Sequence, residues 1–406
     1  MLSLNKPKLD NLTNEIWKSA ERLRGKFKAY EYQNVILPII VIRRLECVLI
    51  QWREKMREEV SGKRAALNPA ELDKLVKKLE VSQSHFSNAT AHTLESLAAE
   101  DPTLLEDNFR AYLNGFSKNV RDILDHFNYH ATVTQLVKNN RLAPILNQYK
   151  SLTLGPDQLS NLEMGYIYEE LLRRFSEQSG EEAGEHFTPR EVIRLMVNLI
   201  FIEDDDVLTP GNAVVRTVYD PTAGTGGMLS VAAEHLLAHN PAARLTLSGQ
   251  ELNDESYAIC KSDMIGQGQA VDAIKLGDTL RNDLHAGQTF DYCLSNPPYG
   301  VDWRAAEPVV RKEHDAKHGR FDAGLPRISD GQLLFLQHLV SKMRPAVAGE
   351  VNSGGRAAIV LNGSPLFTGG AGSGESEIRR WLLESDLVDA IIALPTNMFF
   401  NTGIAT

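Results

Sequence analysis

The chain has 406 residues and a formal net charge of −10 at pH 7. This length exceeds one ordinary hydrophobic core, so we expect two domains, or one domain with large extensions. Hydrophobic residues at 43% and charged residues at 24% are typical of a soluble globular protein. The negative charge argues against a protein that grips nucleic acid alone over a broad surface, because neutralising phosphates requires clustered Lys and Arg.

Cysteine spacing and hydropathy exclude further classes. Cys47, Cys260 and Cys293 lie far apart without Cys-x-x-Cys spacing, so neither a disulfide framework nor a zinc site is predicted, and a reducing cytoplasm fits. The apolar run at residues 35–42 contains a proline and is too short to span a membrane. No signal peptide and no membrane partner are predicted.

Residues 1–180 predict an all-α domain, because apolar residues recur at spacings of three and four and glycine is scarce. The first 50 residues carry nine Lys or Arg against five Asp or Glu, and this basic face could approach phosphates. A solvated helix face is the commoner meaning of such a run. The basic residues concerned include Lys18, Arg22, Arg24, Lys26 and Lys28. Helices are expected at residues 9–28, 32–59 with a break at Pro38, 71–79, 104–127, 133–149 and 159–178.

A small, polar stretch separates this region from a second domain at residues 181–406. Thr188 suits a helix N-cap and Pro189 the first position of a helix expected at residues 191–200. A cap alone carries no function. The hexapeptide that leads into this helix is Glu185, His186, Phe187, Thr188, Pro189 and Arg190.

From residue 214 onward strands alternate with helices, which is typical of a parallel sheet with crossover helices. The predicted fold class is therefore α/β, a Rossmann-like sheet with helices on both faces behind the all-α domain. Strands are expected at residues 214–219, 245–250, 273–276, 290–294, 356–361 and 388–394. Helices are expected at residues 228–239, 255–267, 332–343 and 376–384.

A glycine-rich turn follows the first predicted strand, where a ligand can approach backbone N–H groups at the positive end of a helix. A dinucleotide fits less well, because the third glycine of a Gly-x-Gly-x-x-Gly pattern is replaced by Leu229. The next acidic residue, Glu251, also comes 27 positions after Gly224 rather than about 20. The turn consists of Asp220, Pro221, Thr222, Ala223, Gly224, Thr225, Gly226 and Gly227.

Two carboxylates follow the next two strands. Glu251 could accept hydrogen bonds from ribose hydroxyls, and Asp278, followed by Thr279, could accept from an adenine amino group. Each carboxylate alone is more often a solvated loop residue. Three strand ends in succession beside a glycine turn favour a nucleoside-like cofactor.

The fourth strand ends in Asn296, Pro297, Pro298 and Tyr299. The prolines end the strand and hold Asn296 extended. An amide oxygen and nearby carbonyls could then accept both hydrogens of a planar amino group, while Tyr299 offers a face for a flat ring. By itself the turn is also compatible with a plain strand end.

Two loops remain. Residues 301–330, which include Trp303 and Phe321, predict either a loop that grips substrate or a disordered segment. Residues 368–374 predict a flexible connection, since they lack the Gly-Lys-Ser/Thr ending of a phosphate loop.

Taken together, the glycine turn, Glu251, Asp278 and the Asn-Pro-Pro-Tyr turn resemble the ordered motifs of S-adenosylmethionine-dependent amino-methyltransferases. Residues 185–190 resemble the extra cofactor motif of the class in which the cofactor site precedes the catalytic site. With the helical region in front and residues 367–370 and 395–403 behind, the chain is similar to the modification subunit of a type I restriction-modification system.

The resemblance implies a methyl transfer from S-adenosylmethionine to the N6 amine of a flipped adenine in DNA. Residues 224–227 with Phe187 and Thr188 would hold the methionine end, Glu251 the ribose and Asp278 the adenine. Asn296 and the Pro297 carbonyl would accept from the amine, with Tyr299 stacking on the base. No metal is implied.

The resemblance also implies partners: DNA, a specificity subunit shared by two modification subunits, and a restriction subunit for cleavage. Because the sequence stops at Thr406, where a seventh strand would begin, we expect that strand and C-terminal helices to be missing. Two alternatives stay open: methylation of protein glutamine or RNA base amines, and a non-catalytic scaffold that binds the cofactor.

Overall fold

The computed structural model describes residues 5–63, 67–179, 188–350, 353–396, 398–399 and 406. By their internal contacts these residues form two compact units. The helical unit comprises Met1–Glu182 with Asp254–Val271, and the sheet unit comprises Ala183–Asn253 with Asp272–Thr406. The units differ from the expected domains chiefly in Asp254–Val271, which connects two strands of the sheet in sequence but packs with the helical unit.

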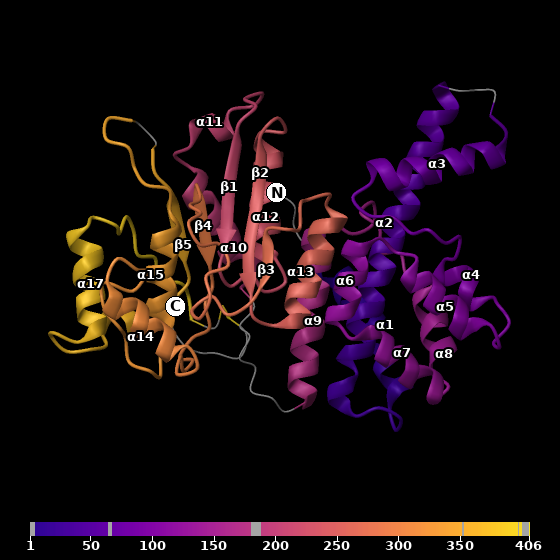
Figure 1. The fold of residues 1–406 in the computed structure, drawn as a ribbon, viewed down its shortest axis with the longest axis horizontal. Coiled ribbons are helices and arrows are strands. Elements are labelled where there is room, and N and C mark those ends of the chain that lie inside the picture. Colours follow the sequence, from indigo (N-terminus) through magenta and orange to yellow (C-terminus); the bar gives the residue numbers. More distant parts are fainter. Residues whose placement is uncertain (1–4, 64–66, 180–187, 351–352, 397, 400–405) are drawn as a thin grey trace. The chain divides into compact units, whose positions relative to one another are not determined.

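The helical unit is built from amphipathic helices around an apolar core, as the spacing of its apolar residues predicts (Figure 1). Its elements are α1 (Lys6–Leu23), η1 (Ala29–Glu31), α2 (Gln33–Lys63), α3 (Pro69–Gln83), α4 (Leu94–Ala98), α5 (Leu105–Asn114), α6 (Lys118–His126), α7 (Tyr129–Lys138), α8 (Leu142–Tyr149), α9 (Asn161–Ser179) and α13 (Asp254–Gly266).

Helix boundaries in this unit depart from expectation in three ways. The helix expected at residues 104–127 is two helices, α5 and α6, separated at residues 115–117. The predicted break at Pro38 is wrong, because α2 continues through it. Pro38 lies in the second turn of α2, so its ring can disturb only the first turn, where the helix begins. The side chains of residues 35–42 are all buried, and this burial stabilises the continuous helix. The helix expected at residues 133–149 is two helices, α7 and α8, separated where Asn140 adopts a φ of 54°.

The sheet unit contains five described strands, β1 (Val215–Asp220), β2 (Arg244–Glu251), β3 (Ile274–Leu276), β4 (Tyr292–Ser295) and β5 (Arg356–Ile359). Their order is β3-β2-β1-β4-β5, and all neighbouring pairs are parallel. The strand order reverses between β1 and β4, and ligands of open α/β sheets bind outside the carboxyl ends at such a reversal. The α/β fold class is confirmed.

Helices cover this sheet on both faces. The crossover through α12 leads from β1 toward β2, and the one through α15 leads from β4 toward β5, in the opposite direction. Tyr292 of β4 packs against Phe201 of α10, and the next residue, Cys293, belongs to a buried cluster with Leu339 of α15. Because successive side chains of a strand point to opposite faces, α10 and α15 lie on opposite faces of the sheet. The described helices of the unit are α10 (Arg190–Phe201), α11 (Asp205–Leu208), α12 (Gly227–His239), α14 (Glu307–Ala316), α15 (Gln332–Lys342), α16 (Ser364–Phe367) and α17 (Gly374–Glu384).

Two expectations for the sheet unit are wrong. Residues 388–394 form no strand, although their alternation of apolar residues resembles one. A strand requires a hydrogen-bonded neighbour, and β5 is the edge strand among the described strands. The disordered alternative for residues 301–330 is also wrong, because the segment contains α14 and buries Trp303 and Phe321. No helix in the described part of the chain is long and apolar enough to cross a membrane.

Candidate active site

The sheet unit gathers the predicted site residues at one edge. Asp220 and Glu251 are the last residues of β1 and β2, Asp278 follows β3, and Asn296 follows β4. Because the four strands are parallel neighbours, their carboxyl ends meet on the same side. Sequence spacing alone placed each residue at a strand end, and the strand order brings them together.

The glycine turn between β1 and α12 has the backbone shape that the sequence predicts. Gly224 and Gly226 have φ of 54° and 86°, values that L side chains rarely adopt, and Gly226 is the N-cap of α12. A Cβ built on Gly224 meets no heavy atom within 4 Å, so the space beside this residue is open. The turn therefore presents its backbone to an open space at the positive end of a helix.

Glu251 is bound to this turn. Its Oε2 accepts from the Gly224 amide at 2.7 Å, and its Oε1 accepts from the Asn253 amide at 2.8 Å. Burial raises the pKa of the Glu251 carboxyl, although these backbone N–H groups oppose the shift. The carboxylate thus lies against the glycine turn, where its position depends on that of Gly224.

Asp220, at the start of the glycine turn, is a buried carboxyl. Its residue is 1% exposed, and Oδ1 accepts from the Thr222 amide at 2.9 Å. Burial raises the pKa of Asp220 to about 7, and the nearby Glu251 adds to the rise. A carboxyl held half-protonated near neutral pH beside a ligand turn is typical of a functional site.

The turn that carries Asp278 is tied to the glycine turn. The Thr279 hydroxyl donates to the Pro221 carbonyl at 2.6 Å. Oδ1 of Asp278 accepts from the amides of Leu280 and Arg281, at 2.9 and 3.2 Å. Thr279 therefore fixes the relative position of the two turns, and Asp278 stabilises its own turn.

Asn296 is oriented by two hydroxyl groups. Its Nδ2 donates to Thr188 Oγ1 at 2.8 Å, and its Oδ1 accepts from the Tyr299 hydroxyl at 2.6 Å. The residue before it, Ser295, shares a 2.9 Å hydrogen bond with Thr222 of the glycine turn. The predicted acceptor residue is thereby joined to both predicted cofactor motifs.

Thr188 has a different local role from the one expected. The N-cap of α10 is Pro189 and the helix begins at Arg190, so the predicted cap at Thr188 is wrong by one residue. The physical reason is that the Thr188 hydroxyl accepts from Asn296 instead of from a backbone amide of the helix. Arg190 is buried on α10, while Glu185, His186 and Phe187 lie outside the described residues.

An aromatic residue at this site was missed. Phe399 is 4% exposed and packs edge-on against Tyr299, with ring centroids 6.1 Å apart. The sequence analysis included Phe399 only as part of residues 395–403. Its one signal was that it is an aromatic residue shortly after the strand expected at residues 388–394. Burial raises the pKa of the Tyr299 phenol, which keeps the hydroxyl a hydrogen-bond donor at neutral pH.

A cavity of about 430 Å³ lies in the helical unit and is lined by none of the predicted site residues. Its walls include four carboxylates, and three of them have partners: Glu31 accepts from the Lys28 amide, Asp254 lies 3.1 Å from the His126 ring, and Glu255 accepts from Gln33. We therefore place the site at the carboxyl edge of the sheet and not in this cavity.

The strand order, the glycine turn after β1 and the oriented Asn296 after β4 define a methyltransferase of the Rossmann-like class. Comparison with known families agrees. The N-6 DNA Methylase family model matches residues 160–406, and the HsdM N-terminal domain model matches residues 12–148. The chain belongs to the N-6 DNA methylase family and, within it, to the methyltransferase subunits of type I restriction-modification systems, which confirms the resemblance drawn from the sequence.

Individual relatives support this assignment. The chain is 23% identical to the type I restriction enzyme MjaIX methylase subunit of Methanocaldococcus jannaschii, over 96% of this chain and 67% of the relative. It is 25% identical to the MpnII methylase subunit of Mycoplasma pneumoniae, over 98% of this chain and 75% of the relative. It spans only 38% of the MjaVII methylase subunit of M. jannaschii, at 32% identity over 59% of this chain.

Solved structures show the same fold. The type I restriction-modification system methyltransferase subunit from Streptococcus thermophilus matches with a TM-score of 0.70 and 25% identity, over 98% of this chain and 83% of that one. A modification subunit of a putative type I restriction enzyme from Vibrio vulnificus matches with a TM-score of 0.57 and 20% identity, over 97% and 79% of the two chains.

Proposed function

We propose that the sheet unit binds S-adenosylmethionine at the turns after β1, β2 and β3 and methylates the N6 amine of an adenine rotated out of duplex DNA. Family membership supports the reaction, and the open space beside Gly224, whose amide donates to Glu251, supports the cofactor site. The turn from Asp220 to Gly227 with Phe187 and Thr188 would hold the methionine end, Glu251 the ribose hydroxyls and Asp278 the adenine amine. When bound, the cofactor supplies an electrophilic methyl group on a sulfonium.

The observation that carries the proposal is the orientation of Asn296. Its amide nitrogen is engaged by Thr188, so its oxygen is directed to the donor that Tyr299 now supplies at 2.6 Å. The N–H of an adenine amine is a donor of the same kind and can replace the phenol there. An exocyclic amine is a poor nucleophile because its lone pair is shared with the ring. Acceptance of its hydrogens by Asn296 and the Pro297 carbonyl would localise that lone pair on nitrogen.

Tyr299 and Phe399 serve the base itself. Rotating a base out of a duplex costs a few kcal/mol, and stacking on an aromatic side chain returns about 1–3 kcal/mol. Tyr299 therefore roughly offsets the cost of flipping, and Phe399 holds its ring in place by edge contact. Neither residue needs to act as a base, because alignment of nitrogen, methyl group and sulfur is the main requirement.

We also propose that DNA sequence is read by a partner. The net charge of −10 suits a subunit that receives its DNA from another chain, and Lys18, Arg22, Arg24, Lys26 and Lys28 are exposed residues available to approach phosphates. The partners would be a specificity subunit that serves two modification subunits, and a restriction subunit for cleavage.

The test is an Asn296→Ala variant in the full-length complex with its specificity subunit. Radiolabelled methyl transfer to duplex DNA should fall by about 10²–10³-fold, the usual effect of removing an oriented polar group that acts in the transition state. Cofactor affinity should stay unchanged. The matched control is Asn198→Ala, an exposed residue of α10 in the same unit. Full transfer by Asn296→Ala would overturn the role of Asn296, and binding without turnover by the unaltered complex would favour the scaffold alternative.

A further inference from the structure

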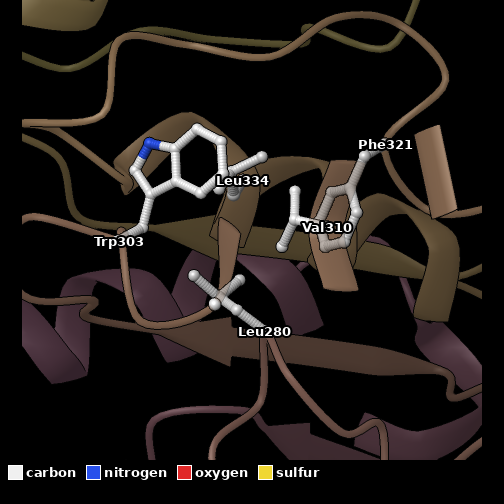
Figure 2. Close-up of a cluster of buried hydrophobic side chains, with 6 residues drawn as sticks. Leu280, Trp303, Val310, Phe321 and Leu334 are labelled. Atoms are coloured by element: carbon white, nitrogen blue, oxygen red, sulfur yellow. The ribbon is translucent and has the colours of Figure 1, made fainter. Parts of the chain in front are cut away.

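Residues 301–330, directly after the Asn-Pro-Pro-Tyr turn, form a folded insert with its own apolar core. Leu280, from the turn that carries Asp278, lies inside that core and points toward side chains of the insert and of α15 (Figure 2). It is 5% exposed. The other buried members are Trp303, Ala306, Val310, Phe321 and Leu334.

The insert is closed at its base by hydrogen bonds between its two ends. Trp303 donates its backbone amide to the Ile328 carbonyl at 3.0 Å and its indole N–H to the Arg327 carbonyl at 2.8 Å. The Gly331 amide donates to the Val301 carbonyl at 3.1 Å. The segment therefore acts as one body, whose first residues follow the methyl-accepting turn.

Arg320 connects this body to the turn that carries Asp278. Its Nη1 donates to the Thr279 carbonyl at 2.7 Å and its Nη2 to the Leu280 carbonyl at 3.1 Å. These carbonyls belong to the same two peptide units whose N–H groups, those of Leu280 and Arg281, donate to the Asp278 carboxylate. One planar guanidinium thus fixes their carbonyls from the side opposite to the amides that bind the Asp278 carboxylate.

The Arg320 guanidinium is itself positioned by two side chains, Glu313 and His338. Glu313 of α14 accepts from its Nε at 3.0 Å and its Nη2 at 2.8 Å. Nδ1 of the fully buried His338 lies 3.1 Å from Nη1, and burial together with the Arg320 charge lowers the pKa of His338 well below its usual range. A neutral His338 that accepts at Nδ1 donates from Nε2 to the Tyr219 hydroxyl, 3.0 Å away.

We propose that Arg320 is a positioning residue for the adenine subsite of the cofactor: by fixing the Thr279 and Leu280 carbonyls it sets the position of Asp278. This inference rests on the proposed function, in which Asp278 accepts from the adenine amine. It gives residues 301–330 a role different from gripping substrate. The insert forms the support of the cofactor's adenine site and is continuous in sequence with the methyl-accepting turn.

A buried ion pair that only stabilises the fold would produce the same contacts, so the test must separate the two roles. Arg320→Lys keeps a cation opposite Glu313, but its three N–H donors cannot serve Glu313, both carbonyls and His338 at once. The matched control is Arg311→Lys on α14, where Arg311 pairs with Glu307 at 2.7 Å and is half exposed. An Asp278→Ala variant tests the residue through which Arg320 is proposed to act.

The measurement is the calorimetric dissociation constant of the full-length chain for two probes. One is S-adenosylhomocysteine and the other is its inosine analogue, which carries oxygen in place of the 6-amino group. Arg320→Lys should weaken the adenosyl probe by about tenfold, the usual effect of misplacing a hydrogen bond to a charged group, and change the inosyl probe little. The preference for the adenosyl probe therefore falls, while Arg311→Lys retains it.

Equal weakening of both probes by Arg320→Lys would show a merely structural role and overturn the inference. If Asp278→Ala abolishes the preference and Arg320→Lys retains it, the inference fails and the proposed function stands. If Asp278→Ala retains the preference, the adenine role of Asp278 is refuted, and the inference that depends on it falls with it.

Discussion

The buried Asp220 carboxyl should destabilise the folded chain at neutral pH, and replacing it by an amide should remove that cost. Asp220→Asn keeps the shape of the side chain and an oxygen for the Thr222 amide that now donates to Oδ1 at 2.9 Å. It removes the group that ionises. The variant is therefore a probe of burial alone, because the packing around β1 is kept.

The size follows from the pKa. Burial raises the pKa of Asp220 from 3.8 to about 7. At 1.36 kcal/mol for each pH unit, this corresponds to about 4 kcal/mol of lost stability once the carboxyl is ionised in both states. Well below pH 4 both states are protonated and nothing is lost. Between pH 4 and pH 7 the unfolded chain ionises while the folded chain keeps its proton, so stability falls, and above pH 7 the loss is constant.

The free energy of unfolding of the sheet unit, from denaturant titrations at several pH values, measures this effect. Asp220→Asn should match the unaltered chain near pH 3 and exceed it by up to about 4 kcal/mol at pH 8. Glu251 is present in both proteins, so its own contribution largely cancels. Asp272→Asn, at an exposed position in the same unit, is the control. A difference between Asp220→Asn and the unaltered chain that does not change with pH would refute the reasoning.

Two further predictions concern the acceptor residue. Thr188→Val removes the hydroxyl that accepts from Asn296, so kcat for DNA methylation should fall about tenfold. Thr188→Ser keeps a hydroxyl and should retain most of kcat. Equal rates for the two variants would contradict the role of this hydroxyl. Tyr299→Phe keeps the ring and removes only the phenol that donates to the Asn296 oxygen, so DNA methylation should persist. Tyr299→Ala should raise KM for DNA by about 10–100-fold through the loss of stacking, and an unchanged KM in that variant would exclude stacking as the role of Tyr299.

The sheet was predictable because its signals are local. Each of the five described strands lies in a run that ends at an acidic residue or just before a glycine or asparagine, as β4 does before Asn296. The sixth expected strand, residues 388–394, failed for a reason that a local pattern does not contain. Val388 and Ile391 are 38% and 69% exposed, and pairing depends on a neighbouring strand as well as on the residues themselves.

The sequence predicted which site residues lie at strand ends, but it did not predict the hydrogen bonds that connect them to distant parts of the chain. Spacing placed Glu251 and Asp278 correctly at the carboxyl edge, because the end of a parallel strand fixes the edge to which its residue belongs. The bond between Thr188 and Asn296 joins residues 108 positions apart, and no local pattern encodes it. The same holds for Arg320, whose partners Thr279 and Leu280 lie about 40 positions earlier in the sequence.

These long-range bonds make the cofactor and acceptor motifs one network. Thr188 binds Asn296 from the motif that precedes the sheet, and Thr222 binds Ser295 from the glycine turn. A shift of either proposed cofactor motif would therefore be transmitted to the amide of Asn296, the proposed acceptor. In the structure the Asn296 oxygen accepts from Tyr299, so a base that binds there as proposed would exchange one hydrogen bond for another instead of adding one. The network thus contributes orientation more than affinity, which is what a reaction limited by alignment of nitrogen and methyl requires.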